Sequence, residues 1–233
     1  FQTSIPELTS TKYAMKADYA LSHTDSNETF LEMAKKLSLP LDDYKKLKTY
    51  SENIGIKFLS TPFDIVSINY LNKLGLDCYK IPSGEIINLP YLREIGRLNK
   101  KVIMSTGMAK LSEVNDALEV LINSGTDKAK ITLLHCNTEY PTPYEDVDLR
   151  AMTTLRDEFG VRVGYSDHSL VSDTGLLASK AALALGADII ERHFTLLPPG
   201  ETRDGPVSIN PGQLKELADF ASTPIERRIE FMD

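Results

Sequence analysis

The sequence has no tryptophan, only two cysteines and only four histidines. Cys78 and Cys136 lie far apart without CxxC spacing, which argues against a disulfide scaffold or a structural zinc site and favours reducing surroundings. Long apolar runs are also missing, because the longest stretches, such as 176–185, end well short of the roughly 20 residues that a membrane span needs. We therefore expect a cytoplasmic protein that has no membrane segment.

Positively charged residues are also fewer than negatively charged ones. The 233 residues include 26 lysines and arginines against 33 aspartates and glutamates, a formal net charge of −7, which argues against nucleic-acid binding. The first residues, Phe1 to Thr3, lack a methionine, a charged segment and an apolar segment, so they resemble neither a translation start nor a signal peptide. From this start we expect the chain to be a fragment of a longer protein.

What the sequence does contain is a repeated unit, in which a short apolar run is followed by a polar or glycine-containing cluster and then by an amphipathic stretch. This alternation predicts β-strands and α-helices in turn. The runs end 22 to 31 residues apart, which is typical of βα units in a parallel sheet. The predicted strands are 57–60, 78–81, 101–105, 131–135, 162–165 and 188–193.

Predicted helices fit between these strands, at 41–54, 65–74, 91–98, 111–123, 149–159, 174–185 and 211–220. If residues 1–3 end an earlier strand, there are seven parallel strands, and an eighth upstream would close a (β/α)8 TIM-type barrel. An open doubly wound sheet is the competing fold. No GxGxxG motif follows a predicted strand, which argues against a dinucleotide-binding sheet of that kind.

Chemically useful side chains gather where the predicted strands end, which is the catalytic face of such a barrel. Hydroxyl groups, glycine turns and a lysine in these segments suit a phosphate-bearing ligand. His168 and His193 end two neighbouring strands, so they can share a divalent metal, although each can equally be a hydrogen-bonded histidine at the rim. His135 and His23 are assigned no role.

Lys80 shares the strand face of Pro82, so alternation directs it toward the barrel interior. A buried lysine needs a counter-charge, and Glu191, on the same strand face as His193, is a candidate. A strand lysine can also form a Schiff base with a carbonyl substrate. A Schiff-base aldolase that uses Lys80 is therefore the enzymatic alternative to metal chemistry.

The strand ends, taken together and in order, resemble those of the sialic acid synthase family over most of the chain, from Phe1 to about Phe220. The matching segments read FQT (1–3), FLSTPFD (58–64), KIPSGE (80–85), STGM (105–108), LHC (134–136), EYP (139–141), GYSDH (164–168) and ERHFT (191–195). The resemblance implies a barrel enzyme that condenses phosphoenolpyruvate with an N-acetylated hexose, such as N-acetylmannosamine or a related 2,4-diacetamido sugar. The products are a nine-carbon 2-keto acid and phosphate.

The resemblance also implies roles for particular residues. His168 and His193 match metal ligands, usually for Mn2+ with Mg2+ or Co2+ possible, and Glu85 matches an acidic residue near the reacting carbons. Phosphoenolpyruvate would be held by Lys80, Ser83, Ser105 and Ser166, with Thr61 and Thr138 as additional contacts; the sugar side would be Gln2, Tyr140 and Asp204. A homodimer is what the family suggests.

The sequence departs from the family pattern in three places. An acidic residue and a lysine of the family would precede Phe1, and the loop that contains Asp204 differs from the Gly-Pro-Asp-His segment of many members. The chain also stops at Asp233, without the small antifreeze-like domain that usually follows. We expect residues 1–222 to form the barrel without its first strand and helix, and 223–233 to be an unassigned tail. A non-catalytic fragment that binds a phosphosugar is the third possibility.

Overall fold

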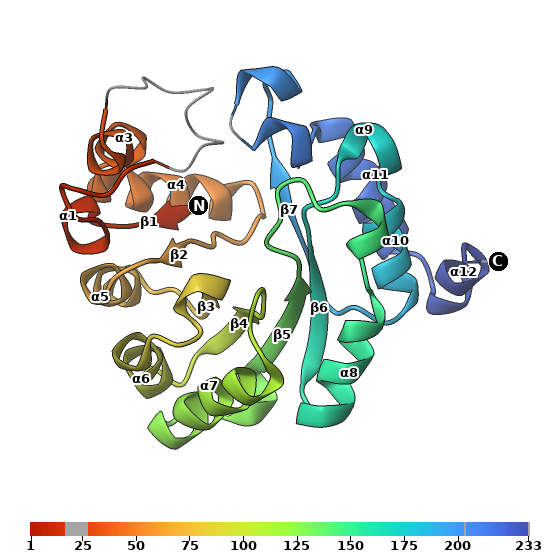
Figure 1. Ribbon diagram of the computed structural model, residues 1–233, viewed down its shortest axis with the longest axis horizontal. Coiled ribbons are helices and arrows are strands. Elements are labelled where there is room, and N and C mark those ends of the chain that lie inside the picture. Colours follow the sequence, from red (N-terminus) through yellow and green to blue (C-terminus); the bar gives the residue numbers. More distant parts are fainter. Residues whose placement is uncertain (17–27, 203, 233) are drawn as a thin grey trace. The chain divides into compact units, whose positions relative to one another are not determined.

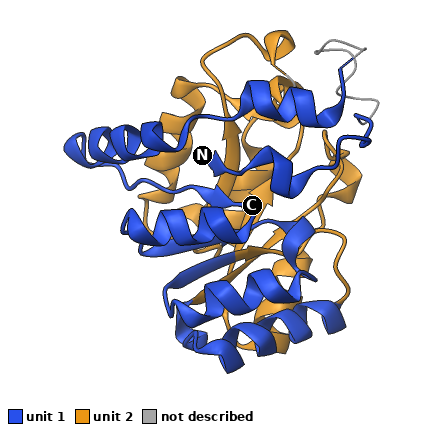
Figure 2. Ribbon diagram, turned by 90° about the vertical axis from the view of Figure 1, so that its left-hand side faces the viewer, with its two compact units in different colours: residues 1–103, 111–130 blue, residues 104–110, 131–233 orange. Residues whose placement is uncertain are grey.

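The computed structural model describes residues 1–16, 28–202 and 204–232, so His23 lies outside the described residues. The chain divides into two compact units, one of residues 1–103 and 111–130 and the other of residues 104–110 and 131–233 (Figure 2). Among the described helices, none is both long and apolar enough to cross a membrane.

The first unit begins with a pair of very short parallel strands, in which Gln2 lies opposite Thr61. Its helices cover the strands that follow (Figure 1). The elements are β1 (Gln2–Thr3), α1 (Pro6–Thr9), α3 (Phe30–Leu37), α4 (Leu41–Asn53), β2 (Thr61–Pro62), α5 (Ile65–Lys73), β3 (Cys78–Ile81), η1 (Ser83–Glu85), α6 (Leu89–Arg97), α7 (Leu111–Ser124) and η2 (Lys128–Lys130). Strand β4 (Lys101–Ser105) starts in this unit beside β3 and ends in the second unit beside β5.

The second unit continues the sheet in sequence order, with β5, β6, β7 and β8 side by side and parallel. Its elements are β5 (Ile131–Cys136), η3 (Tyr144–Asp146), α8 (Arg150–Phe159), β6 (Arg162–Asp167), α9 (Val171–Thr174), α10 (Leu177–Ala184), β7 (Ile190–Phe194), η4 (Pro199–Glu201), η5 (Gly205–Val207), β8 (Ser208–Ile209), α11 (Pro211–Ala221) and α12 (Ile225–Glu230). Helices α8 and α10 pack against these strands (Figure 1).

This strand order confirms the predicted α/β fold, a partial (β/α)8 TIM-type barrel. Consecutive parallel strands with a helical crossover between them build a barrel wall, whereas a doubly wound sheet reverses its strand order at a switch point. The polar residues that follow the strands of the second unit therefore share the carboxyl end of that part of the wall. The buried side chains beneath them are apolar, as in Leu133, Leu134 and Val163.

Several predicted boundaries were wrong, each for a local reason. The strand expected at 57–60 lies instead at Thr61–Pro62, because its pairing partner is β1 and the ladder runs from Phe1 to Thr3. The helix expected at 174–185 is two helices, since Gly175 adopts φ 56° and ψ −121° between α9 and α10. Helix α6 starts two residues early because the Asn88 side chain caps it and Pro90 is tolerated in its first turn.

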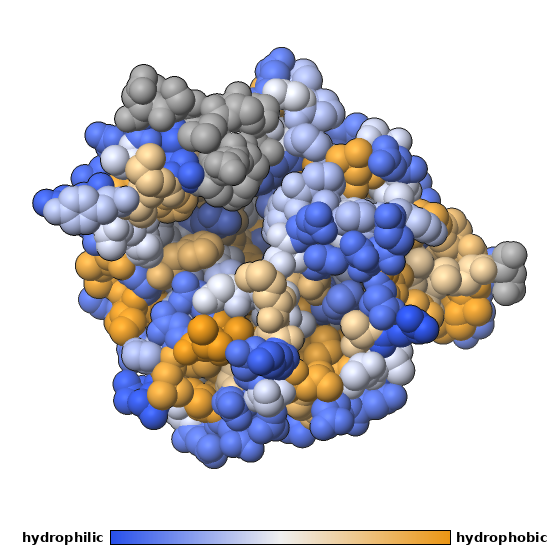
Figure 3. All heavy atoms as spheres, in the orientation of Figure 1, coloured by the Kyte–Doolittle hydropathy of each residue, from blue (hydrophilic) through white to orange (hydrophobic). Residues whose placement is uncertain are grey.

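Residues 208–209 and 223–233 hold elements that the sequence did not predict. Strand β8 pairs with β7, where His193 lies opposite Ser208. Helix α12 packs against α10, and the ring of Phe231, which follows α12, lies 5.2 Å from that of Phe220 on α11. Apolar side chains of this segment stay accessible, with Ile229 at 50% exposure. Figure 3 shows an apolar patch at the right-hand side, where Figure 1 places α12.

Candidate active site

The site is built on two histidines that neighbouring strands bring together in the second unit. His168 directly follows β6 and His193 lies near the end of β7. Because Asp167 pairs with Arg192 in the parallel ladder, the two histidines follow at the same level of the sheet. Their ring centroids are 5.5 Å apart, with an angle of 62° between the ring planes. Both imidazoles thus border one small region at the carboxyl end of the strands.

The hydrogen bonds of His168 determine where its proton lies. Its Nδ1 is 2.6 Å from the backbone carbonyl of Asn137, which can only accept, so Nδ1 carries the hydrogen. Nε2 is therefore the atom with the lone pair. Burial lowers the pKa of His168, opposed by the bond to Asn137, and the neutral ring is favoured. A neutral imidazole whose Nε2 is aimed into the site is a ready metal ligand.

Tyr140 and Ser166 surround that lone pair. The Tyr140 hydroxyl is 2.8 Å from His168 Nε2 and the Ser166 hydroxyl is 3.3 Å from it. Ser166 has one hydrogen, and it donates this to the Glu191 carboxylate at 2.7 Å. Tyr140 is consequently the donor to Nε2. Its ring also stacks on the imidazole, with a centroid distance of 4.0 Å.

His193 faces a carboxylate from the following loop. Its Nδ1 is 3.7 Å from Asp204 Oδ2, and both side chains are about one third exposed. The ring of Tyr140 meets His193 edge to face at 5.5 Å. The loop that carries Asp204 depends on Gly205, because a Cβ there would lie 2.0 Å from the carbonyl oxygen of Pro199. Within the second unit, these contacts therefore link five side chains into one cluster: Tyr140, Ser166, His168, His193 and Asp204.

This cluster suits a divalent metal with open positions. In the described part of the chain, no three histidine, cysteine or acidic side chains are arranged as a metal site. Two imidazoles supply only part of a coordination shell, so substrate oxygens and water would complete it, as in catalytic rather than structural sites. His168 and His193 are the residues that can hold such an ion, and Glu191 and Asp204 add negative charge beside them.

A comparison with known protein families shows to which family the chain belongs. The model of the NeuB family matches residues 1–226. The chain belongs to the NeuB family. This confirms the resemblance to sialic acid synthases that the strand ends indicated.

Proteins similar to this NeuB-family chain are named as synthases of legionaminic acid or of sialic acid. An N,N'-diacetyllegionaminic acid synthase of Campylobacter jejuni is 51% identical over 88% of this chain and 60% of its own length. One of Legionella pneumophila is 40% identical over 93% and 60%. A crystal structure of an N-acetylneuraminic acid (sialic acid) synthetase from Leptospira borgpetersenii, in complex with citrate, superposes with a TM-score of 0.81 at 28% identity, covering 100% of this chain and 73% of that one. The chain thus spans about 60% of the length of these two curated relatives.

The other predicted site residues of the NeuB-family chain in the second unit are Ser105 and Thr138. Ser105 ends β4 and is 3% exposed, and its hydroxyl finds no hydrogen-bond partner among the described residues. A buried hydroxyl without a partner costs free energy unless a ligand or water satisfies it, which fits the predicted contact with phosphoenolpyruvate. Thr138 lies half-buried in the loop after β5.

The remaining predicted residues lie in the first unit. Gln2 and Thr61 are opposite each other on β1 and β2, and Lys80 is 5% exposed on β3. Ser83 and Glu85 follow in the short helix η1, where the Glu85 carboxylate accepts a hydrogen bond of 2.6 Å from the Asn88 side chain. Their roles in substrate binding, and the pairing of Lys80 with Glu191, stay predictions.

Sequence reasoning missed two features that support the histidines. The first is the Asn137 carbonyl, a backbone group that no sequence pattern displays. The second is an ion pair between Asp167 and Arg192, whose atoms are 2.6 Å apart. A signal for it was present: an acid and a base each stand one residue before a candidate metal histidine.

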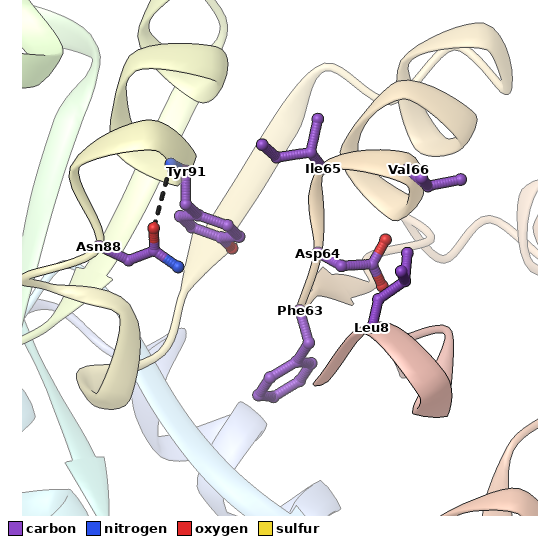
Figure 4. Close-up of a pocket in the computed structure, with 7 residues that line it drawn as sticks. All are labelled: Leu8, Phe63, Asp64, Ile65, Val66, Asn88 and Tyr91. Atoms are coloured by element: carbon purple, nitrogen blue, oxygen red, sulfur yellow. Dashed lines mark hydrogen bonds between the residues drawn. The ribbon is translucent and has the colours of Figure 1, made fainter. Parts of the chain in front are cut away.

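The first unit of this NeuB-family chain also contains a pocket that the sequence did not predict. It has a volume of about 320 Å3 and lies at the starts of α5 and α6, lined by Leu8, Phe63, Asp64, Ile65, Val66, Asn88 and Tyr91 (Figure 4). Its polar groups are already paired: Asp64 caps α5 and Asn88 caps α6, and the Tyr91 hydroxyl donates to the carbonyl of Pro62. Nothing in it calls for a polar ligand.

The pH dependence of stability can be predicted from His135. Its Nε2 is buried without a hydrogen-bond partner among the described residues, and burial lowers the pKa of His135, opposed by the charge of Asp148. Because the unfolded chain takes up a proton that the folded protein disfavours, the free energy of unfolding should fall as pH drops below about 6.5. His168 acts in the same direction. In urea unfolding, His135→Phe should lose less stability between pH 7 and pH 5 than the wild type; an equal loss contradicts this.

Proposed function

We propose that this NeuB-family chain carries the catalytic barrel of a synthase that condenses phosphoenolpyruvate with an N-acetylated hexose. The products are a nine-carbon 2-keto acid and inorganic phosphate. The supporting observation is the neutral imidazole of His168, held by the Asn137 carbonyl with its Nε2 lone pair facing the site beside His193. This arrangement suits a reaction in which an aldehyde oxygen must be polarised.

The proposed acceptor is a 2,4-diacetamido sugar rather than N-acetylmannosamine. The two relatives named N,N'-diacetyllegionaminic acid synthase are 51% and 40% identical to this chain, whereas the solved structure named for N-acetylneuraminic acid is 28% identical. The loop containing Asp204, for which the family resemblance implies a position on the sugar side, is also where the chain departs from the family pattern. This loop would contact the sugar substituents that distinguish the two acceptors.

His168 and His193 are proposed to hold the divalent ion, which is Mn2+ or, as alternatives, Mg2+ or Co2+. When bound, such an ion acts as a Lewis acid that stabilises the negative charge developing on the aldehyde oxygen. The chain's contribution is to keep the His168 imidazole neutral and oriented. The carbonyl of Asn137 fixes its orientation.

The other residues would bind the substrates and move protons. Lys80, Ser83, Ser105 and Ser166 would hold phosphoenolpyruvate, with Thr61 and Thr138 beside them; Gln2, Tyr140 and Asp204 would hold the sugar. In the reaction, the C2=C3 π electrons of phosphoenolpyruvate form the bond from C3 to the aldehyde carbon, and the C=O π pair moves to the aldehyde oxygen. Water adds to C2, and the proton that it releases is balanced by the one that the aldehyde oxygen takes up to become a hydroxyl. The tetrahedral carbon then expels phosphate with cleavage of the C–O bond. Glu85 would take the proton of that water.

The test is phosphate release by the chain with Mn2+, phosphoenolpyruvate and either a 2,4-diacetamido-2,4,6-trideoxyhexose or N-acetylmannosamine. We expect release only when an acceptor is present, faster with the diacetamido sugar. With 18O in the bridging position of phosphoenolpyruvate, C–O cleavage places the label in phosphate.

Two outcomes would contradict the proposal. Binding of phosphoenolpyruvate without turnover, by a folded chain with both sugars, would favour the non-catalytic fragment. Borohydride trapping of pyruvate on Lys80 in the presence of a chelator would favour the Schiff-base aldolase, and Lys80→Arg, which keeps the charge, is the matched control for that trapping.

A further inference from the structure

The strands that carry the two histidines are joined by a fully buried ion pair. Arg192 Nη1 lies 2.6 Å from Asp167 Oδ1, and the two side chains are 3% and 0% exposed. The two residues are direct partners in the ladder between β6 and β7. Arg192 Nη1 also lies 3.3 Å from the carbonyl oxygen of Asp167 and 3.4 Å from the hydroxyl of Ser169.

The Asp167 carboxylate also shapes the backbone around His168. It accepts a hydrogen bond of 2.9 Å from the amide of Ser169, so the turn closed by this bond has His168 as its central residue. A third bond, of 2.5 Å from the Ser179 hydroxyl, ties the same carboxylate to α10. Side chains alternate along a strand, so Asp167 and Arg192 lie on the sheet face opposite to Ser166 and Glu191. The ion pair therefore acts from behind the site.

Folding stability does not explain this arginine. Its Nε and Nη2 groups are buried without a hydrogen-bond partner in the part of the chain that the structure describes. Unsatisfied buried donors are costly, and apolar residues of similar volume often replace a buried ion pair with no loss of stability. An apolar pair of side chains would lack a directional interaction that fixes the register of β6 against β7.

We propose that Asp167 and Arg192 are positioning residues, which set the distance between the rings of His168 and His193 by locking β6 to β7 and the turn at His168 to α10. That the rings then bind a metal rests on the proposed function. The placement of the two rings in the metal-free protein does not depend on the proposed function. The positioning role and the metal assignment can therefore each be refuted without the other.

The test compares three variants of the full chain with the wild type. The double variant Asp167→Leu/Arg192→Met replaces the pair by apolar side chains and leaves no unpaired charge. Asp167→Glu keeps both charges but lengthens one side chain by a methylene. Leu155→Ala is the control, because Leu155 is 5% exposed on α8, which packs against β5 and β6, and its truncation lowers stability away from the histidines.

Two measurements are made on each protein. The first is the nuclear Overhauser effect between the His168 and His193 rings without metal, observable at a centroid distance of 5.5 Å. The second is the Mn2+ dissociation constant by calorimetry with phosphoenolpyruvate present. We expect the double variant to lose the ring contact and to bind Mn2+ about 10- to 100-fold more weakly, the range found when outer partners of metal ligands are removed. Leu155→Ala should keep both signals.

An unchanged ring contact together with unchanged Mn2+ binding in the folded double variant overturns the proposal. If the double variant does not fold, Asp167→Glu provides the same test with the same two measurements. A positioning role predicts that the longer acid disturbs the ring contact and Mn2+ binding, whereas a merely electrostatic role tolerates it. If the wild type binds no Mn2+ but the variant still loses the ring contact, positioning stands and the metal assignment in the proposed function falls.

Discussion

His168→Ala and His193→Ala are each expected to weaken Mn2+ binding by more than about 100-fold. Loss of an outer partner of a ligand typically costs 10- to 100-fold, and loss of one of only two protein ligands must cost more. In the described residues no third histidine, cysteine or carboxylate stands in a metal-binding group with them that could compensate. Calorimetric titration with Mn2+ in the presence of phosphoenolpyruvate measures the effect directly, and catalysis should be lost in parallel.

Two matched variants make this experiment specific. His135→Ala removes a histidine of the same unit that stacks on Tyr165 outside the cluster, and it should leave Mn2+ binding unchanged. Tyr140→Phe removes the hydroxyl that donates to His168 Nε2, the lone pair a metal must use. Mn2+ should therefore bind Tyr140→Phe at least as tightly as the wild type. Full Mn2+ affinity in either histidine-to-alanine variant would refute the two-histidine site.

Gly164→Ala is expected to destabilise the protein by about 1–3 kcal/mol, the cost of overpacking a filled core, or more. A Cβ at this position of β6 would lie 2.3 Å from the carbonyl oxygen of Ile189 and 2.7 Å from the Leu134 side chain. That carbonyl cannot retreat, because it accepts the amide hydrogen of Tyr165 at 2.9 Å. The strand would have to shift, and Ser166 and His168 would move with it.

Urea unfolding measures the loss, with Gly200→Ala as the control. A Cβ at Gly200 would meet nothing within 4 Å, so this variant should keep wild-type stability. Mn2+ titration of Gly164→Ala in its folded range should show weaker binding, because β6 leads directly to His168. Equal stability of the two glycine variants would show that β6 can yield at this point, contrary to our expectation.

Much of the fold could be predicted because each βα unit has a local sequence pattern, an apolar run followed by an amphipathic stretch. Strands β3 and β4 lie where the apolar runs placed them, at 78–81 and 101–105. The short strands could not be placed in this way. Two-residue strands such as β2 and β8 carry no periodicity, and each exists only because a neighbouring strand offers hydrogen-bond partners.

For the site, the sequence by itself determined which residue types end the strands, and the resemblance of those segments indicated the sialic acid synthase family. It also predicted that His168 and His193 end neighbouring strands. Tertiary structure alone decided the chemistry of each atom. It places the Asn137 carbonyl against His168 Nδ1, directs the Ser166 hydroxyl to Glu191 and joins Asp167 to Arg192. The physical reason is that hydrogen bonds depend on distance and direction between groups 25 to 31 residues apart, and only packing sets these.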